Sequence, residues 1–165
     1  MRKTAIVTGA ARGIGLATTD LFLAEGRRVA MIDWDADELA KAAAARENVL
    51  PIRCDVSDPK AVAAMADQIA HDLKEVHALV NNAGVADFGP IDDCDFATWR
   101  RVMSVNLDGV FLCSQAISPL LKASKGAIVN IASISGLRAS TLRVAYGTSK
   151  AGVIHLTQQQ AAEWG

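Results

Sequence analysis

Short apolar runs alternate with segments whose apolar residues recur every three or four positions, almost without interruption along the chain. The apolar runs contain five to seven residues, mostly Val, Ile, Ala and Leu, and do not alternate with polar positions. Such runs predict strands buried on both faces, whereas the three- or four-residue spacing predicts helices. The predicted strands cover residues 3–8, 29–33, 49–55, 76–81 and 127–133. The predicted helices cover residues 14–25, 35–47, 59–73, 96–122 and 146–164.

Strands that alternate with helices pair in parallel, because each helix carries the chain back to the end of the sheet where the next strand starts. These crossovers are right-handed and place helices on both faces of the sheet. The pattern therefore predicts an α/β fold, a Rossmann-like doubly wound parallel sheet with five strands. The sequence contains no internal repeat, low-complexity tract or linker, so we expect residues 1–165 to form a single domain.

The composition fits a domain with a substantial core, since 51% of the 165 residues are hydrophobic and 21% are charged. Lys and Arg total 17 against 18 Asp and Glu, and aromatic residues make up 5% of the chain. Balanced charge and few aromatic side chains argue against nucleic acid or an anionic membrane surface as a partner. No apolar stretch approaches the ~18 residues that predict a bilayer-spanning helix.

The cysteines do not form a metal-binding or disulfide pattern. Cys54, Cys94 and Cys113 are odd in number and widely spaced, and the three histidines show no ligand spacing either. We therefore expect no metal site and reduced thiols, as in a reducing compartment. The apolar run near the N-terminus is too short for a signal peptide, and together these features predict a cytoplasmic protein.

A glycine-rich turn connects the first predicted strand to the first predicted helix, at residues 8–15. Gly9, Gly13 and Gly15 at this spacing allow a tight turn and a close approach of the backbone to a pyrophosphate. The unpaired N–H groups at the start of the helix then favour phosphate binding. An ordinary glycine-rich connection is the alternative interpretation of the turn taken alone.

An acidic residue, Asp33, ends the second predicted strand, 18 residues after Gly15. A carboxylate at this position can accept hydrogen bonds from both hydroxyls of an adenosine ribose and would repel a 2′-phosphate, which favours NAD over NADP. Two observations leave alternatives open. Asp33 is also placed to cap the helix that begins near Trp34, and Arg12 in the turn is a cation that could meet a 2′-phosphate.

Polar residues end the fourth and fifth predicted strands, at the carboxyl edge where open α/β sheets bind ligands. Asn82-Ala83-Gly84 follows directly on the fourth strand, and Ser133 is the last residue of the fifth. The asparagine side chain can lock neighbouring strands, and the glycine allows a cofactor to lie on the backbone. An ordinary turn would show the same residue types.

The last predicted helix starts with Tyr146, the only tyrosine of the chain, followed four residues later by Lys150. This spacing places the two side chains one above the other on one helix face. A neutral tyrosine is a poor base, but a nearby ammonium group favours its phenolate. Tyr146 could then exchange a proton with a substrate, and Ser133 could hydrogen-bond the substrate oxygen. A solvated helical pair is the alternative.

Taken together and in this order, these motifs closely resemble the short-chain dehydrogenase/reductase family, in its shorter oxidoreductase branch. The resemblance covers essentially all 165 residues. It rests on Thr8-Gly9-x-x-x-Gly13-x-Gly15, Asp55-Val56, Asn82-Ala83-Gly84, Asn106, Ser133 and Tyr146-x-x-x-Lys150. By this resemblance the activity is NAD(P)-dependent hydride transfer between a nicotinamide and a secondary alcohol or ketone, with Tyr146 as general acid/base.

The resemblance also implies residue roles. Asp55 and Val56 would lie beside the adenine, and Asn106 would complete a catalytic tetrad by distorting its helix and holding a water that relays protons to Lys150. The expected catalytic residues are Asn106, Ser133, Tyr146 and Lys150. The expected cofactor-binding residues are Gly9, Arg12, Gly13, Ile14, Gly15, Asp33, Trp34, Asp55, Val56, Asn82, Ala83, Gly84, Tyr146 and Lys150.

The sequence departs from the family pattern at its C-terminus. Family members continue through sixth and seventh strands and a helix that covers the substrate, so with the family strand order 3-2-1-4-5 the strand at 127–133 would be a free edge. A fragment and a naturally short chain are both open interpretations. We expect the isolated 165 residues to bind NAD weakly and turn over poorly, and a non-catalytic dinucleotide-binding module is the alternative function. The family also implies a homodimer or homotetramer formed through the last two long helices.

Overall fold

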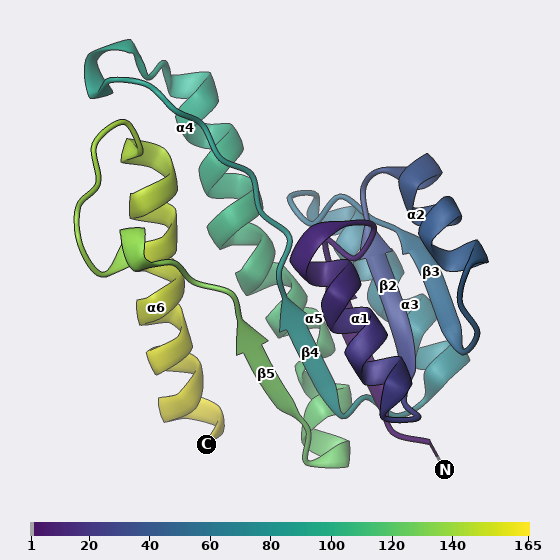
Figure 1. Ribbon diagram of the computed structural model, residues 1–165. Coiled ribbons are helices and arrows are strands. Elements are labelled where there is room, and N and C mark those ends of the chain that lie inside the picture. Colours follow the sequence, from purple (N-terminus) through teal and green to yellow (C-terminus); the bar gives the residue numbers. More distant parts are fainter. Residues whose placement is uncertain (1) are drawn as a thin grey trace.

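The computed structural model describes residues 2–165 and contains a five-stranded parallel sheet in the order β3-β2-β1-β4-β5 (Figure 1). The strands are β1 (Thr4–Thr8), β2 (Arg28–Asp33), β3 (Val49–Arg53), β4 (Ala78–Asn81) and β5 (Ala127–Asn130). The central strand β1 is buried along its whole length, as its uninterrupted apolar sequence requires. The predicted α/β class, strand number, parallel pairing and order are therefore confirmed.

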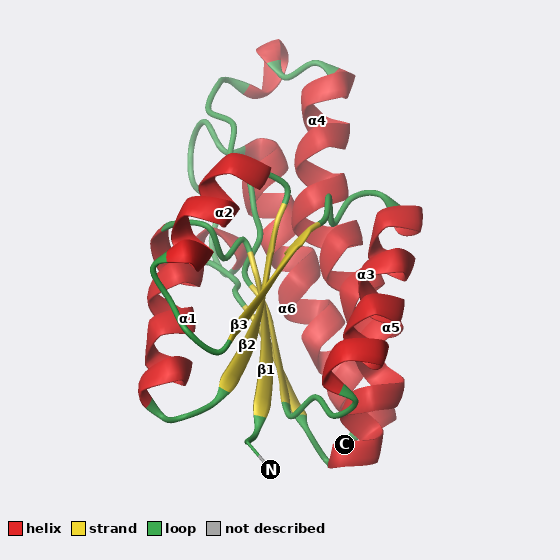
Figure 2. Cartoon of the chain, turned by 90° about the vertical axis from the view of Figure 1, so that its right-hand side faces the viewer, coloured by secondary structure: helices red, strands yellow, loops and turns green. Residues whose placement is uncertain are grey.

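Helices cover both faces of this sheet, and Figure 2 shows α1 and α2 on one side with α3 and α5 on the other. The α-helices are α1 (Gly13–Ala24), α2 (Ala36–Ala44), α3 (Pro59–Leu73), α4 (Phe96–Met103), α5 (Gly109–Ser124) and α6 (Val144–Trp164). α6 packs against α4 and borders β5. No helix within residues 2–165 is both long and apolar enough to cross a lipid bilayer.

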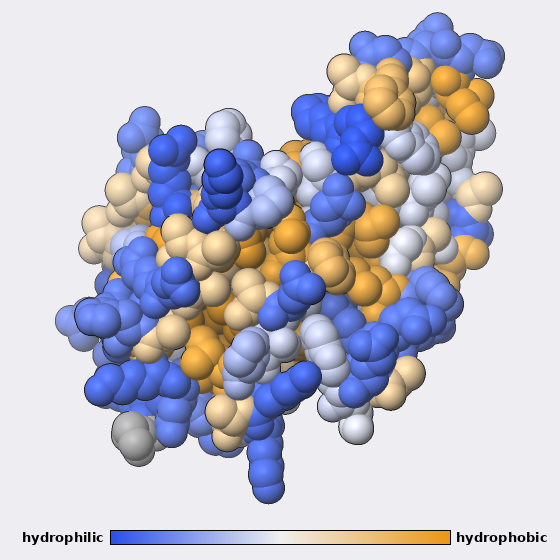
Figure 3. All heavy atoms as spheres, turned by 180° about the vertical axis from the view of Figure 1, so that it is seen from behind, coloured by the Kyte–Doolittle hydropathy of each residue, from blue (hydrophilic) through white to orange (hydrophobic). Residues whose placement is uncertain are grey.

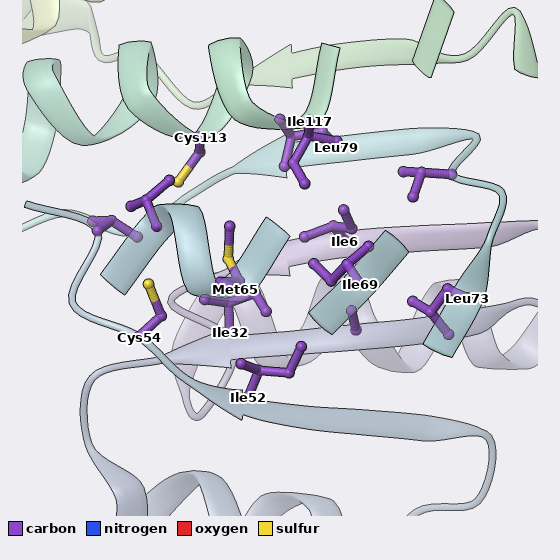
Figure 4. Packing of buried hydrophobic residues seen from close by; sticks show 14 of the residues in the cluster. Ile6, Ile32, Ile52, Cys54, Met65, Ile69, Leu73, Leu79, Cys113 and Ile117 are labelled. Carbon is purple, nitrogen blue, oxygen red and sulfur yellow. The ribbon is translucent and has the colours of Figure 1, made fainter. Parts of the chain in front are cut away.

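The core consists of one apolar cluster on each face of the sheet. Figure 4 shows the larger cluster, in which Met65 and Ile69 of α3 meet Ile6 and Ile32 of the strands. The smaller cluster lies under α1 and α2 and includes Met31 of β2. Because parallel strands are covered on both sides, successive residues of β1 and β2 enter opposite clusters, and this explains their unbroken apolar sequence.

The segment predicted as one helix over residues 96–122 is divided. α4 and α5 are joined by a π-helical stretch, Ser104–Asp108, that contains the fully buried Asn106. π-Helical turns are rare and often mark functional positions. The distortion near Asn106 that the family resemblance implied is present.

The predicted strand at residues 127–133 is too long. β5 ends at Asn130, because its partner β4 ends at Asn81 and the last ladder bond runs from Ile131 N to Asn81 O at 2.9 Å. Ser133 therefore lies beyond the sheet, where it precedes a short 3₁₀ turn, η3 (Ile134–Gly136). The prediction that Ser133 ends the strand was wrong by three residues, although it remains on the carboxyl side of the sheet.

A polar network joins β4 and β5 to the helices beside them. Asn81 Nδ2 donates to Ser114 Oγ at 3.0 Å and to Asn130 Oδ1 at 2.8 Å. Asn130 Nδ2 in turn donates to Thr157 Oγ1 and Gln160 Oε1, both at 2.9 Å. These bonds fix α5 and α6 against the strands whose carboxyl ends form the site.

Candidate active site

The glycine-rich turn depends on the absence of side chains at three of its positions. Gly9 and Gly13 have φ values of +65° and +57°, which L-residues with a side chain rarely adopt. A Cβ on Gly15 would lie 2.1 Å from the carbonyl oxygen of Gly9, so no other residue fits there without movement of the backbone. The turn therefore brings its own backbone into close contact at the start of α1.

The turn is bound to the end of β4 by Thr8 and Asn82. Thr8 Oγ1 accepts hydrogen bonds from the backbone N–H of Asn82 at 2.9 Å and of Ala83 at 3.0 Å. Asn82 Nδ2 donates to the carbonyl oxygens of Thr8 at 2.9 Å and Gly9 at 3.2 Å. The sequence indicated that Asn82 could lock the strands, but it did not reveal the hydroxyl of Thr8 as the acceptor. A hydroxyl residue at the last position of a buried strand was the available signal.

Replacement of Thr8 by Val is expected to lower the free energy of unfolding by about 1–3 kcal/mol, because two backbone N–H groups lose their acceptor. Thr19→Val is the matched control, since the Thr19 hydroxyl is also buried but only donates to Gly15 O, within its own helix. Urea unfolding of both variants measures the difference. Equal destabilisation by the two substitutions would contradict the role assigned to Thr8.

Asp33 connects the end of β2 to the glycine-rich turn. Its carboxylate accepts from Ala11 N at 3.0 Å and from Asp35 N at 3.1 Å, and the residue is buried. The cap of α2 is Asp35, whose side chain accepts from Glu38 N at 3.2 Å. The alternative interpretation of Asp33 as the helix cap is therefore wrong, and the carboxylate is instead held at the edge of the sheet.

Arg12 is paired rather than free. Its Nη2 donates to Asp35 Oδ2 at 2.6 Å, on a surface where such pairs contribute little to stability. This pairing engages the cation that could otherwise meet a 2′-phosphate. The exposed Trp34 lies next to this pair at the end of β2.

A cleft of about 700 Å³ runs along the carboxyl ends of β1, β2 and β4. Ten of the predicted cofactor-binding residues line it: Gly9, Arg12, Ile14, Asp33, Trp34, Asp55, Val56, Asn82, Ala83 and Gly84. Four further predicted residues do not line it, namely Gly13, Gly15, Tyr146 and Lys150. The sequence missed five lining residues, which are Ile32, Cys54, Val85, Arg101 and Val105.

The missed residues differ in how they could have been found. Ile32, Cys54, Val85 and Val105 each directly adjoin a predicted residue in the sequence, whereas Arg101 comes from α4, where the sequence shows no motif. Burial raises the pKa of the Cys54 thiol to about 11, which favours the neutral thiol over the nucleophilic thiolate at neutral pH. Within residues 2–165, His, Cys, Asp and Glu side chains form no group of three that could hold a metal ion.

Asn106 clamps the segment that follows β4 onto the last helix. Its Oδ1 accepts from Val85 N at 2.8 Å, and its Nδ2 donates to Val85 O at 2.9 Å and to Ser149 Oγ at 3.1 Å. Ser149 Oγ donates in turn to the carbonyl oxygen of Tyr146 at 2.7 Å. The side chain of Asn106 thus connects the cleft to the helical turn that carries Tyr146, and its role in a proton relay stays a prediction.

Lys150 and Tyr146 lie together on α6. Lys150 Nζ is 5.9 Å from the centre of the Tyr146 ring and donates to the carbonyl oxygen of Ile131 at 2.5 Å. Only 4% of Lys150 is exposed, and burial lowers its pKa. Ser133 Oγ accepts from Ser135 N at 3.2 Å, which holds the serine at the start of η3. The arrangement offers a hydroxyl group, a phenol and an amine at one edge of the sheet.

A family model described as short chain dehydrogenase matches residues 3–165. The chain belongs to the short-chain dehydrogenase family. Proteins of this family bind nicotinamide cofactors, and the glycine-rich turn with the adjoining cleft provides a place for one.

Other short-chain dehydrogenases are similar to this chain over almost its entire length. The D-threitol dehydrogenase of Mycolicibacterium smegmatis is 41% identical over 99% of the chain, and the meso-2,3-butanediol dehydrogenase of Serratia marcescens is 37% identical over 99%. The match covers 65% and 66% of these two relatives, so the chain spans about two thirds of their length. A short-chain dehydrogenase of Burkholderia phymatum in complex with NAD superimposes with a TM-score of 0.93 and 32% identity, over 98% of this chain and 60% of that one.

Proposed function

We propose that the protein is an NAD-dependent dehydrogenase that oxidises secondary alcohols to ketones and catalyses the reverse reduction. The observation that carries this proposal is the buried amine of Lys150, which lies 5.9 Å from the centre of the Tyr146 ring and next to Gly84 of the cleft wall, where a Cβ would be 3.8 Å from Nζ. The hydrogen bond from Lys150 Nζ to the carbonyl oxygen of Ile131 holds this amine beside the Tyr146 ring. An enzyme that moves a proton at Tyr146 explains why both groups are held there.

The residues present fit a dinucleotide. A Cβ on Gly9 would lie 2.9 Å from the Cα of Ala83, so only glycine lets the turn approach the end of β4 this closely at the wall of the cleft. The N-terminus of α1 favours phosphate groups, and Asp33 offers a carboxylate for ribose hydroxyls. Asp55 and Val56 would contact the adenine, and Lys150 the nicotinamide ribose.

In the proposed mechanism Tyr146 accepts the proton of the substrate hydroxyl as the C–H bond of the carbinol carbon breaks. The hydride that leaves this carbon would be taken up by a nicotinamide held in the cleft. Lys150 places its amine beside the Tyr146 ring, and Ser133 orients the substrate oxygen by a hydrogen bond. Asn106 positions the helical turn of Tyr146 through Ser149. The carbinol carbon is oxidised to a carbonyl, and one hydride and one proton leave the substrate.

The proposed preference for NAD over NADP rests on Asp33. We expect Asp33→Ser to weaken NADH binding by roughly 10–100-fold, because hydrogen bonds to a charged group are lost. Asp37→Ser is the matched control, as Asp37 is an exposed acid in the first turn of α2 that does not line the cleft. Fluorescence titration with NADH and NADPH measures both affinities, and equal binding of the two cofactors by the unsubstituted protein would refute the preference.

Relatives support small alcohols as substrates. Two are named as dehydrogenases of D-threitol and meso-2,3-butanediol, which are both polyhydric alcohols. Formation of NADH from a panel of secondary alcohols, followed by absorbance, tests the activity directly. A dinucleotide-binding module without catalysis is not favoured, because these relatives are named as enzymes.

We also propose that the protein assembles through α5 and α6. Phe111 of α5 is 47% exposed, and it lines a surface hollow together with Leu107, Leu112 and Leu156. Exposed apolar groups of this kind mark interaction surfaces in soluble proteins. A homodimer or homotetramer would cover them.

A further inference from the structure

Arg143 occupies a distinctive position directly before α6. The carbon at the centre of its guanidinium lies 4.7 Å from the centre of the Phe88 ring and 5.9 Å from that of Tyr146. Phe88 belongs to the segment between β4 and α4, which Figure 1 shows protruding from the body of the molecule. A hydrogen bond from Gly89 N to Leu142 O at 3.2 Å joins this segment to the loop that precedes α6. Arg143 therefore connects the proposed catalytic tyrosine to this protruding segment.

The guanidinium of Arg143 has no partner for its hydrogen-bond donors within residues 2–165. Five other arginines of the described chain pair with carboxylates, but Arg143 has neither an ion pair nor a side-chain hydrogen bond. Contact with aromatic rings uses the flat faces of a guanidinium and leaves the N–H groups at its edge free. The side chain is partly buried, so these donors are only partly solvated. A cation in this state favours an anion as a ligand.

The hollow beside Arg143 also favours a negatively charged ligand. A hollow of about 640 Å³ lies between residues 89–91, residues 135–144 and the first turns of α6. Arg138 and Arg143 line it, and no Asp or Glu does. Figure 3 shows apolar side chains among hydrophilic ones at the protruding end of the molecule, where Phe88 and Ile91 are exposed. An anion bound here would meet cations and apolar surface rather than opposing acids.

We propose that Arg143 binds a carboxylate of the substrate, so that the alcohol oxidised at Tyr146 is a hydroxy acid. This inference rests on the proposed dehydrogenase function, because it takes Tyr146 as the proton acceptor. The planar fork of a guanidinium matches the two oxygens of a carboxylate, and its contact with the Tyr146 ring holds the bound acid beside the phenol. Arg143 acts as a specificity residue that selects the substrate by its charge.

The test compares acids with their neutral amides, which have nearly the same shape. Binding of lactate against lactamide and of 3-hydroxybutyrate against 3-hydroxybutanamide is measured by ligand-observed NMR with NADH present in excess. In at least one pair we expect the acid to bind roughly 10–100-fold more tightly than the amide. Arg143→Met should abolish this preference, Arg143→Lys should retain part of it, and added KCl should reduce it.

Arg27→Met is the matched control. Arg27 also lies over an aromatic ring, at 5.3 Å from the centre of Phe22, and its loss changes the net charge by the same amount. It should keep the preference for the acid. NADH affinity and circular dichroism of the Arg143 variants verify that they are folded, and the KCl dependence of the unsubstituted protein tests the charge interaction without any substitution.

The outcomes separate this inference from the function on which it rests. Oxidation of neutral secondary alcohols without any preference for acids, or a preference that survives Arg143→Met, would overturn the assignment of Arg143 and leave the dehydrogenase function intact. Loss of the preference in Arg27→Met as well would overturn it too, because a general charge effect would then explain the result. Failure to bind or oxidise any of these alcohols would overturn both proposals.

Discussion

Replacement of Tyr146 by Phe is expected to lower kcat for alcohol oxidation by about 10²–10⁴-fold, the usual contribution of a positioned proton acceptor. The substitution removes one hydroxyl group, and no residue between 2 and 165 hydrogen-bonds that hydroxyl. The ring keeps its contacts with Arg143 and Lys150. We therefore expect almost unchanged stability and NADH affinity, so the loss should fall on kcat rather than on folding or cofactor binding.

The measurement is formation of NADH from the best substrate of the alcohol panel, at several pH values. Because Tyr146 is the only tyrosine of the chain, no other phenol can replace it or confuse the result. Ser118→Ala is a suitable control, since it removes an exposed hydroxyl on α5 that donates to Gln115 O in the same helix. A Tyr146→Phe protein with full activity would exclude the proposed mechanism.

Replacement of Gly15 by Ala should impair both folding and cofactor binding. The new Cβ would lie 2.1 Å from Gly9 O and 2.6 Å from Asn82 Nδ2, so the turn and its link to β4 would have to move. Overpacking of this kind costs about 1–3 kcal/mol of unfolding free energy. We expect NADH affinity to fall beyond detection, because the displaced turn is the proposed pyrophosphate site.

Alanine substitutions at two other glycines distinguish the effect of a steric clash from that of backbone strain. Gly13 and Gly26 both have positive φ and open space where a Cβ would lie, so alanine there costs only the strain of roughly 1–2 kcal/mol. Gly26 lies outside the turn, and Gly26→Ala should leave NADH affinity unchanged. Urea unfolding and NADH titration of the three variants measure both effects. Normal NADH binding by Gly15→Ala would show that the turn is not the phosphate site.

The sequence predicted the architecture well because local and global preferences agree. Unbroken apolar runs occur where both faces of a strand are covered, and the sheet has this property throughout its centre. The glycine spacing likewise matches a physical requirement, as the contact between Gly15 and Gly9 O demonstrates. Such features follow from the residues themselves and need no knowledge of distant contacts.

Other features depend on contacts between segments far apart in the chain, and the sequence could not reveal them. The hydroxyl of Thr8 acquires its role only because Asn82 lies beside it, 74 positions later. The end of β5 is set by the length of β4 rather than by its own residues, which explains the misplaced Ser133. The contact of Arg143 with the ring of Phe88, 55 positions earlier, likewise arises only in the folded chain.

The side chain of Asn106 also has a consequence for motion. Its amide holds both backbone groups of Val85 and reaches α6 through Ser149, so one side chain holds both the cleft wall and α6. Any motion that frees the Val85 amide must break its hydrogen bond to Asn106, the side chain that also holds Ser149 in the helical turn of Tyr146. Hydrogen exchange at that single amide proton would thus measure how often the helical turn that carries Tyr146 is released.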